Sequence, residues 1–127
     1  MTPDRACDVR VGRLLKRADF LRVAATRVKW AAPGLILQAA PMPDPSSEDY
    51  IRVGFTTSKK VGGAVERNRA RRRLRAAVAE VFPFEAGSGR DYVVIGRTET
   101  LTRSYSLLLQ DLRTALKRVS SFLETRT

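Results

Sequence analysis

Histidine is absent from the 127 residues, and cysteine occurs only once. Without an imidazole the chain has no Ser-His or Cys-His pair for nucleophilic catalysis, and no cysteine and histidine set that could hold a structural metal. The thirteen acidic residues are scattered and form no pattern typical of a paired acid and base or a two-metal site. The sequence therefore argues against a catalytic or metal site carried by the protein itself.

Long apolar runs are missing as well. None approaches the ~20 residues that a membrane span needs, and Met1 to Arg10 is polar and of mixed charge, unlike a secretory signal. The one cysteine, Cys7, excludes an internal disulfide and fits a reducing compartment. These features predict a cytoplasmic protein with no membrane partner, and no feature indicates a protein partner.

Positive charge is what the chain has in excess. Its formal net charge is +11, and the segment from Lys59 to Arg75 holds eight cations against one acid, Glu66. Hydrophobic residues make up 43%, which fits a folded domain rather than a disordered basic tail. Such a clustered positive charge predicts a polyanionic partner, with nucleic acid as the first candidate.

The basic segment has the periodicity of an amphipathic helix. At 3.6 residues per turn an apolar stripe faces a core, and cations occupy the opposite side around Asn68. The stripe consists of Ala70, Leu74, Ala77, Val78 and Val81. Five arginines within seven residues repel one another, and a polyanion would remove that repulsion. The positive face is therefore interpreted as a nucleic-acid surface rather than a merely solvated one.

The start of this helix offers a second basic feature. Lys59 and Lys60 precede the glycine pair Gly62 and Gly63, where the backbone can turn sharply. The first amides of the helix and the positive end of its dipole would then face the same way as the two lysines. This arrangement predicts a phosphate-binding seat.

Around this helix the pattern predicts a single α+β domain over residues 1–127, with helices packed on one mixed sheet of about four strands. Residues 1–12 are expected to be disordered, and 83–89 to form a linker. The other predicted helices span 13–25 and 104–123, and the predicted strands span 35–40, 50–58 and 92–96.

Two features outside the basic helix could also contact a ligand. The strand over 50–58 alternates apolar residues with small or polar ones, so Thr56 and Ser58 would leave room for a ligand backbone. Phe20 follows Lys16 and Arg17, and two interpretations remain open for it. It is either a core aromatic or a platform on which a base stacks beside a basic groove.

The ordered run over 59–75 resembles the signature of the bacterial ribonuclease P protein component, whose hallmark is Arg-Asn-Arg. The residues that carry this resemblance are Lys59-Lys60-Val61-Gly62, Ala64-Val65, Arg67-Asn68-Arg69, Arg71, Arg72 and Arg75. Weaker landmarks extend the resemblance from Arg13 to Leu123. They are Arg13-Leu14, Lys16, Asp19-Phe20, Val23, Arg52-Val53-Gly54 and the segment 91–95.

The resemblance implies a subunit of a ribonucleoprotein that removes the 5′ leader of precursor tRNA. It implies that the partner RNA carries the active site and its Mg²⁺, that the protein alone binds no cofactor, and that the crossover around the basic helix is left-handed. The residues implied to bind catalytic RNA are Lys59, Lys60, Arg67, Asn68, Arg69, Arg71, Arg72 and Arg75. Those implied to bind the leader are Lys16, Arg17, Phe20, Thr56 and Ser58. A ribosomal or generic RNA-binding structural protein is the alternative, and it predicts no second, leader-binding surface.

Several positions depart from the family pattern. Ala24 and Gln38 stand where an aromatic is common in the family, so they weaken the expected stacking on the leader. Gly63 replaces a common asparagine, and Arg73 replaces a common leucine.

Overall fold

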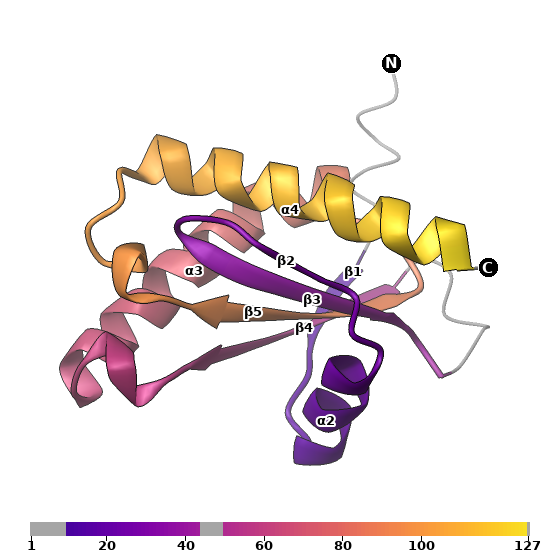
Figure 1. The fold of residues 1–127 in the computed structure, drawn as a ribbon, viewed down its shortest axis with the longest axis horizontal. Helices are drawn as coiled ribbons and strands as arrows, with labels where there is room; N and C mark the ends of the chain where they lie inside the picture. Colours follow the sequence, from indigo (N-terminus) through magenta and orange to yellow (C-terminus); the bar gives the residue numbers. More distant parts are fainter. Residues whose placement is uncertain (1–9, 44–49, 127) are drawn as a thin grey trace.

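The computed structural model describes residues 10–43 and 50–126, which form one mixed sheet with helices on both faces (Figure 1). The sheet has the strand order β1-β4-β5-β3-β2. β1 and β4 pair in parallel, as do β4 and β5, and the remaining pairs are antiparallel. The strands are β1 (Arg10–Arg13), β2 (Lys29–Ala31), β3 (Leu35–Pro41), β4 (Tyr50–Thr57) and β5 (Arg90–Gly96).

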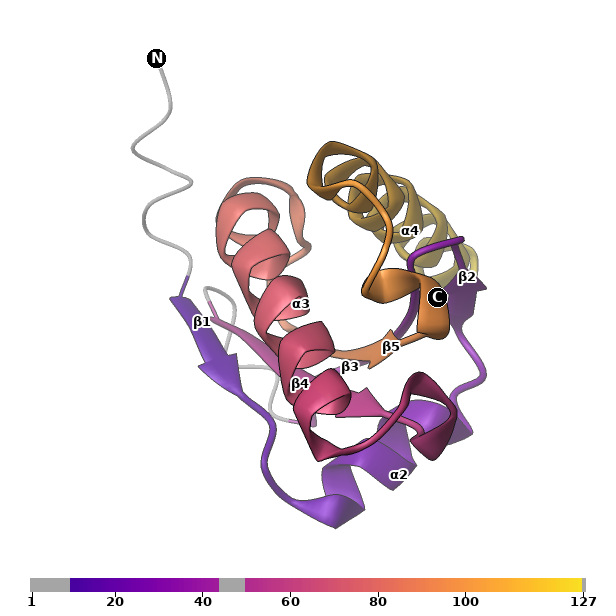
Figure 2. The same ribbon diagram turned by 90° about the vertical axis from the view of Figure 1, so that its left-hand side faces the viewer.

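Two long helices, α3 and α4, cover one face of the sheet, and the short helix α2 lies on the other (Figure 2). Their bounds are Arg17–Ala25 for α2, Ala64–Glu85 for α3 and Tyr105–Arg126 for α4. Two short 3₁₀ turns, η1 (Lys59–Val61) and η2 (Thr98–Thr100), precede α3 and α4 respectively.

The core has two parts because the sheet is covered on both sides. The larger part lies between the sheet and α3 and α4, and all five residues of the predicted apolar stripe of α3 are buried. At its centre the rings of Phe82 and Tyr92 meet edge to face with centroids 5.1 Å apart. The smaller part, beneath α2, consists of Leu14, Val23, Ala40 and Val93, with Phe20 and Ile95 packed against it.

The connection from β4 through α3 to β5 is left-handed, as the resemblance implies. In Figure 2 the parallel strands β4 and β5 point toward the viewer, β5 lies to the right of β4, and α3 passes above the sheet between them. Nearly all such crossovers are right-handed. The local sequence pattern does not encode this exception.

The expected fold class is correct, but the strand count and several boundaries are wrong. The sheet has five strands rather than about four, and β2 is a strand of only three residues in a segment where none was predicted. Residues 10–12, expected to be disordered, belong to β1. This strand depends on its long-range pairing with β4, which no local pattern reveals. Residues 1–9, with Cys7, lie outside the described part of the chain.

Helix boundaries also differ from the expectation. The first helix begins at Arg17 rather than Arg13, because Leu14 still continues the sheet with a hydrogen bond from its N–H to the Val53 carbonyl (3.0 Å). The expected linker from Pro83 begins inside α3, which continues to Glu85. Proline lacks a backbone N–H and so removes one hydrogen bond from a helix. Pro83 lies in the last turn of α3, and the helix continues past it to Glu85.

Candidate nucleic-acid interface

The side of α3 that faces away from the core carries an array of cations. We call it the arginine face and define it as Arg67, Asn68, Arg69, Arg71, Arg72 and Arg75. Asn68, Arg69, Arg72 and Arg75 are exposed, whereas Arg67 and Arg71 are half-buried. The structure therefore brings together on one helix face all six residues that the sequence pointed to on α3.

Within the arginine face, Arg71 and Asn68 are fixed to each other and to the sheet. One nitrogen of the Arg71 guanidinium donates to the Asn68 side-chain oxygen, and the other donates to Thr57 Oγ1 at 3.2 Å. Asn68 therefore orients the guanidinium of a neighbouring arginine. The ordered guanidinium loses less freedom on binding a phosphate than a mobile one would.

Arg73 lies outside this array although it falls in the same basic run. Its guanidinium donates to the backbone carbonyls of Thr100 (2.6 Å), Leu101 (3.0 Å) and Arg103 (2.6 Å). These carbonyls belong to η2 and the loop that leads into α4. Arg73 thus ties the two long helices together, a structural role for the position where leucine is common in the family.

The start of α3 differs from the predicted phosphate seat. Lys59 and Lys60 are exposed in η1, as a phosphate contact would require, and Gly62 has φ 142°, a conformation that favours glycine. However, the Gly63 N–H donates to the Glu66 carboxylate at 2.9 Å. The helix start is therefore occupied by a carboxylate of its own chain, and the two lysines remain as the basic feature there.

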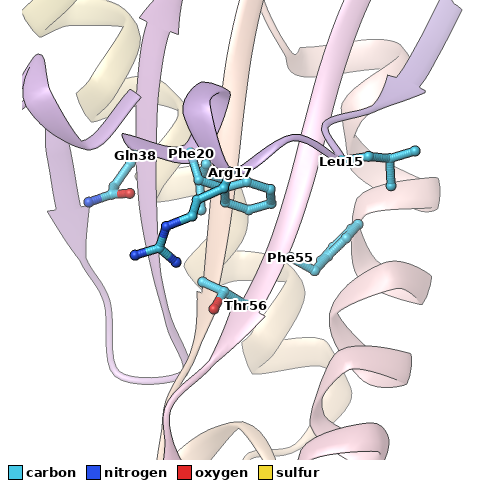
Figure 3. Close-up of a pocket in the computed structure, with 7 residues that line it drawn as sticks. Leu15, Arg17, Phe20, Gln38, Phe55 and Thr56 are labelled. Carbon is cyan, nitrogen blue, oxygen red and sulfur yellow. The ribbon is translucent and has the colours of Figure 1, made fainter. Parts of the chain in front are cut away.

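A pocket of about 420 Å³ lies on the other face of the sheet, beside α2 (Figure 3). We call it the leader pocket because Arg17, Phe20 and Thr56, three of the residues that the resemblance implies for leader binding, line it. It is lined by Leu15, Arg17, Phe20, Gln38, Phe55, Thr56 and Val93. One cation, two aromatic rings and two neutral polar side chains meet there, a combination that suits a single nucleic-acid strand with exposed bases.

The position of Phe20 is compatible with both interpretations that its sequence left open. Its ring is half-buried and packs against the smaller core, and it also forms part of the pocket wall. It lies directly over Gly54, where a Cβ atom would come within 2.5 Å of Phe20 Cζ. Glycine at position 54 therefore lets the ring approach the sheet.

A buried ion cluster holds α2 in place over the sheet. The Asp91 carboxylate is fully buried and pairs with Arg22 of α2 and with Arg52 of β4, at 2.8 and 2.7 Å for the latter. These contacts with Asp91 raise the pKa of Arg52 above its ordinary value. Because both arginines converge on one carboxylate, the cluster fixes the position of α2 and with it the position of Phe20.

Metal and membrane features are absent from the part of the chain that the structure describes. Within residues 10–43 and 50–126 no group of three or more Cys, Asp or Glu residues is placed to hold a metal ion. None of the helices in these ranges is long and apolar enough to cross a bilayer.

Comparison with known proteins assigns the chain to a family. The family model for Ribonuclease P matches residues 10–120. The ribonuclease P protein component of Paramagnetospirillum magneticum is 69% identical over 117 residues, covering 91% of this chain and 88% of that protein. The chain belongs to the ribonuclease P protein family.

Solved structures of ribonuclease P proteins share the fold. The protein from Thermotoga maritima superposes with a TM-score of 0.70 at 26% identity, covering 84% of this chain and 96% of that one. The Staphylococcus aureus protein gives a TM-score of 0.67, also at 26% identity, with coverage of 83% and 92%. As a ribonuclease P protein, the chain is a subunit of an endoribonuclease complex. It associates with ribonuclease P RNA and has a role in tRNA processing.

Within this ribonuclease P protein, the residues expected to bind the leader are only partly brought together. Arg17, Phe20 and Thr56 line the leader pocket, whereas Lys16 and Ser58 do not. Lys16 is exposed at the start of α2, and the Ser58 hydroxyl accepts a hydrogen bond from the Lys60 N–H at 3.3 Å.

Sequence reasoning missed Leu15 and Phe55 as pocket residues. Leu15 lies within the helix predicted over 13–25, yet it precedes α2 and its side chain is 78% exposed. Phe55 is an apolar residue of the strand predicted over 50–58, and it packs against the larger core while also reaching the pocket. The sequence did offer one signal for Phe55. It lies near the end of β4, where a neighbouring strand can stop pairing and leave a side chain accessible to a ligand.

Proposed function

We propose that this protein binds ribonuclease P RNA through the arginine face and holds the 5′ leader of precursor tRNA in the leader pocket. The single observation that carries the proposal is the presence of two separate surfaces of different chemistry on opposite sides of the sheet. The arginine face is a helix surface rich in cations, whereas the leader pocket is a hollow lined by two aromatic rings and one cation. A generic RNA-binding protein has no need of the second surface.

The arginine face suits a structured RNA. Guanidinium groups bind phosphates in a bidentate manner and also stack on bases. The Arg71–Asn68–Thr57 contacts hold part of this array in position before any RNA binds. Lys59 and Lys60 extend the positive surface past the start of α3, so they could contact the same RNA.

The leader pocket suits an unpaired strand. A base could stack on Phe20, while Arg17 meets a phosphate and the amide and hydroxyl of Gln38 and Thr56 meet polar edges of the base or sugar (Figure 3). Mature tRNA has no leader, so contacts in this pocket would act on the precursor alone. The protein would thereby favour substrate over product.

The chemistry itself is assigned to the partner RNA. Mg²⁺ ions bound by that RNA would activate water and stabilise the leaving oxygen in phosphodiester hydrolysis. The protein would contribute assembly and substrate positioning, which agrees with its lack of histidine.

Reconstitution tests this division of labour. Purified protein is mixed with precursor tRNA in the presence of Mg²⁺, with and without ribonuclease P RNA, and release of the leader is followed. We expect cleavage only when the RNA is present, and a higher affinity of the complex for precursor than for mature tRNA. Cleavage by the protein alone would contradict the assignment of catalysis to RNA, and equal affinities would contradict the leader pocket.

A further inference from the structure

The edge of β4 is open beside the leader pocket. β1 pairs with β4 only over the first half of the latter, from Arg10 opposite Tyr50 to Arg13 opposite Val53. After the Leu14 hydrogen bond to Val53, the chain leaves the sheet toward α2. Within the described residues, no strand pairs with this side of β4 from Gly54 to Thr57.

Two further hollows lie along this open edge. The junction hollow has a volume of about 240 Å³ and is lined by Arg13, Leu14, Leu15, Phe20, Val53, Gly54, Phe55 and Arg75. The second, of about 360 Å³, runs between β1 and α3, and we call it the β1–α3 groove. It is lined by Val11, Gly12, Arg13, Val53, Phe55, Arg75, Val78, Ala79 and Pro83.

These hollows connect the two faces of the sheet. The junction hollow shares Leu15, Phe20 and Phe55 with the leader pocket, and it shares Arg13 and Arg75 with the β1–α3 groove. Phe55 lines all three. The three hollows are therefore neighbours along the edge of β4, in the positions that a chain-like ligand would follow from the leader pocket to the side of the sheet that α3 covers.

The chemistry of this path suits single-stranded nucleic acid. The Arg75 guanidinium lies over the Phe55 ring, 5.6 Å from its centroid, and Arg13 is exposed at the same edge. Apolar side chains of β1 and α3 line the rest of the groove, and no acidic residue lines any of the three hollows as described. The phosphates of the strand would bind to the two arginines, and its bases would pack against the apolar side chains of the groove.

We propose that the β1–α3 groove binds the 5′-distal nucleotides of long leaders, which pass from the leader pocket around the edge of β4 at Phe55. This inference rests on the proposed function, because the groove can receive a leader only if the pocket does. It assigns to Arg13 a role in substrate binding that is separate from assembly with ribonuclease P RNA. Arg75 would lie where the arginine face and the leader path meet.

Leader length is the variable that tests the proposal. The reconstituted complex is given precursor tRNAs with a leader of about two or about twelve nucleotides, the latter within the ~4–16 that one small single-strand-binding domain covers. We expect Arg13→Ala to weaken binding of the long-leader precursor about fivefold or more, through loss of a phosphate contact. Binding of the short-leader precursor should remain unchanged. Lys117→Ala, which removes an exposed cation from α4, is the matched control and should affect neither.

A second variant probes the groove away from Arg13. Ala79 is exposed on α3 and lines the groove, so Ala79→Glu places a negative charge there without opening the core. It should weaken binding of the long-leader precursor alone, while Thr114→Glu on α4 should not.

The outcomes separate this inference from the proposed function. Suppose that both groove variants bind the long-leader precursor normally, in a complex that still prefers precursor over mature tRNA. This result would contradict leader binding in the β1–α3 groove but not leader binding in the leader pocket. Weakened assembly with ribonuclease P RNA in both variants would instead assign the groove to that RNA and would likewise overturn the inference. If the unmodified complex showed no preference for precursor tRNA, both the groove and the leader pocket would be wrong.

Discussion

Arg72 and Arg73 are adjacent in the sequence, yet their guanidinium groups lie in different environments. Arg72 is exposed on the arginine face, whereas Arg73 donates hydrogen bonds to three backbone carbonyls between η2 and α4. Two residues of one type, one position apart, thus differ in role: Arg73 holds the fold together, whereas Arg72 is exposed on the surface proposed to bind RNA. Helix periodicity explains the difference, because each step along α3 turns the side chain by about 100°.

Arg73→Ala should destabilise the protein without altering its RNA-binding surface. The change leaves three carbonyls without their donor, and an unsatisfied buried polar group costs about 1–3 kcal/mol. Thermal melting should show a clear decrease in Tm for Arg73→Ala and little change for the matched variant Arg72→Ala. Equal melting temperatures for the two variants would show that the carbonyl contacts of Arg73 contribute nothing to stability.

At the scale of elements, α3 is the helix that packs on the core and carries the surface proposed to bind RNA. Its buried stripe packs on the sheet, and its opposite side gathers the cations. α4 has a comparable buried stripe but a different outer side, where Arg113 pairs with Glu85 at 2.8 Å. Of these two helices, α3 therefore presents the denser array of positive charge.

The salt dependence of RNA binding should identify α3 as the helix in contact. Binding through phosphates releases counterions, so log affinity falls linearly with log salt, and each cation lost flattens the slope by about 0.7–1 unit. We expect this change for Arg72→Ala but not for Lys117→Ala, an exposed cation of α4. Lys117 is a better control than Arg113, which is engaged with Glu85. Identical slopes for the two variants would place the RNA on another surface.

Local pattern predicted the elements that depend on their own sequence. The stripes of α3 and α4 repeat with the helical period, and the Ser104 side chain accepts from the Leu107 N–H at 3.4 Å at the start of α4. β1 and β2 escaped prediction because each has only three or four residues, and β1 also depends on β4, a partner strand distant in sequence. The left-handed crossover likewise came from the family resemblance rather than from periodicity.

The candidate site was predictable to different extents on its two surfaces. The arginine face follows from one helix, so periodicity alone brought its residues together. The leader pocket draws on α2, β3, β4 and β5, and its shape depends on how α2 lies on the sheet. That position is set by the Asp91 cluster with Arg22 and Arg52, and by Gly54 beneath Phe20. None of these long-range contacts could be read from spacing.

At the scale of the whole molecule, the sheet separates the two surfaces that are proposed to bind RNA. α3 and the arginine face lie on one side, and α2 with the leader pocket lies on the other (Figure 2). Changes on one side should therefore leave binding at the other surface intact, except at Phe55 and Arg75, where the two sides meet. This separation is the central claim of the proposed function.

Phe20→Leu tests that claim most directly. Leucine keeps most of the apolar packing against the smaller core but removes the aromatic face that would stack on a base, a contact worth about 1–3 kcal/mol. In the reconstituted complex we expect affinity for precursor tRNA to fall about 5- to 150-fold, with mature tRNA binding and assembly with ribonuclease P RNA unchanged. A melting curve checks that the variant is folded. Unchanged precursor affinity, or equal losses for precursor and mature tRNA, would contradict the assignment of Phe20 to leader recognition.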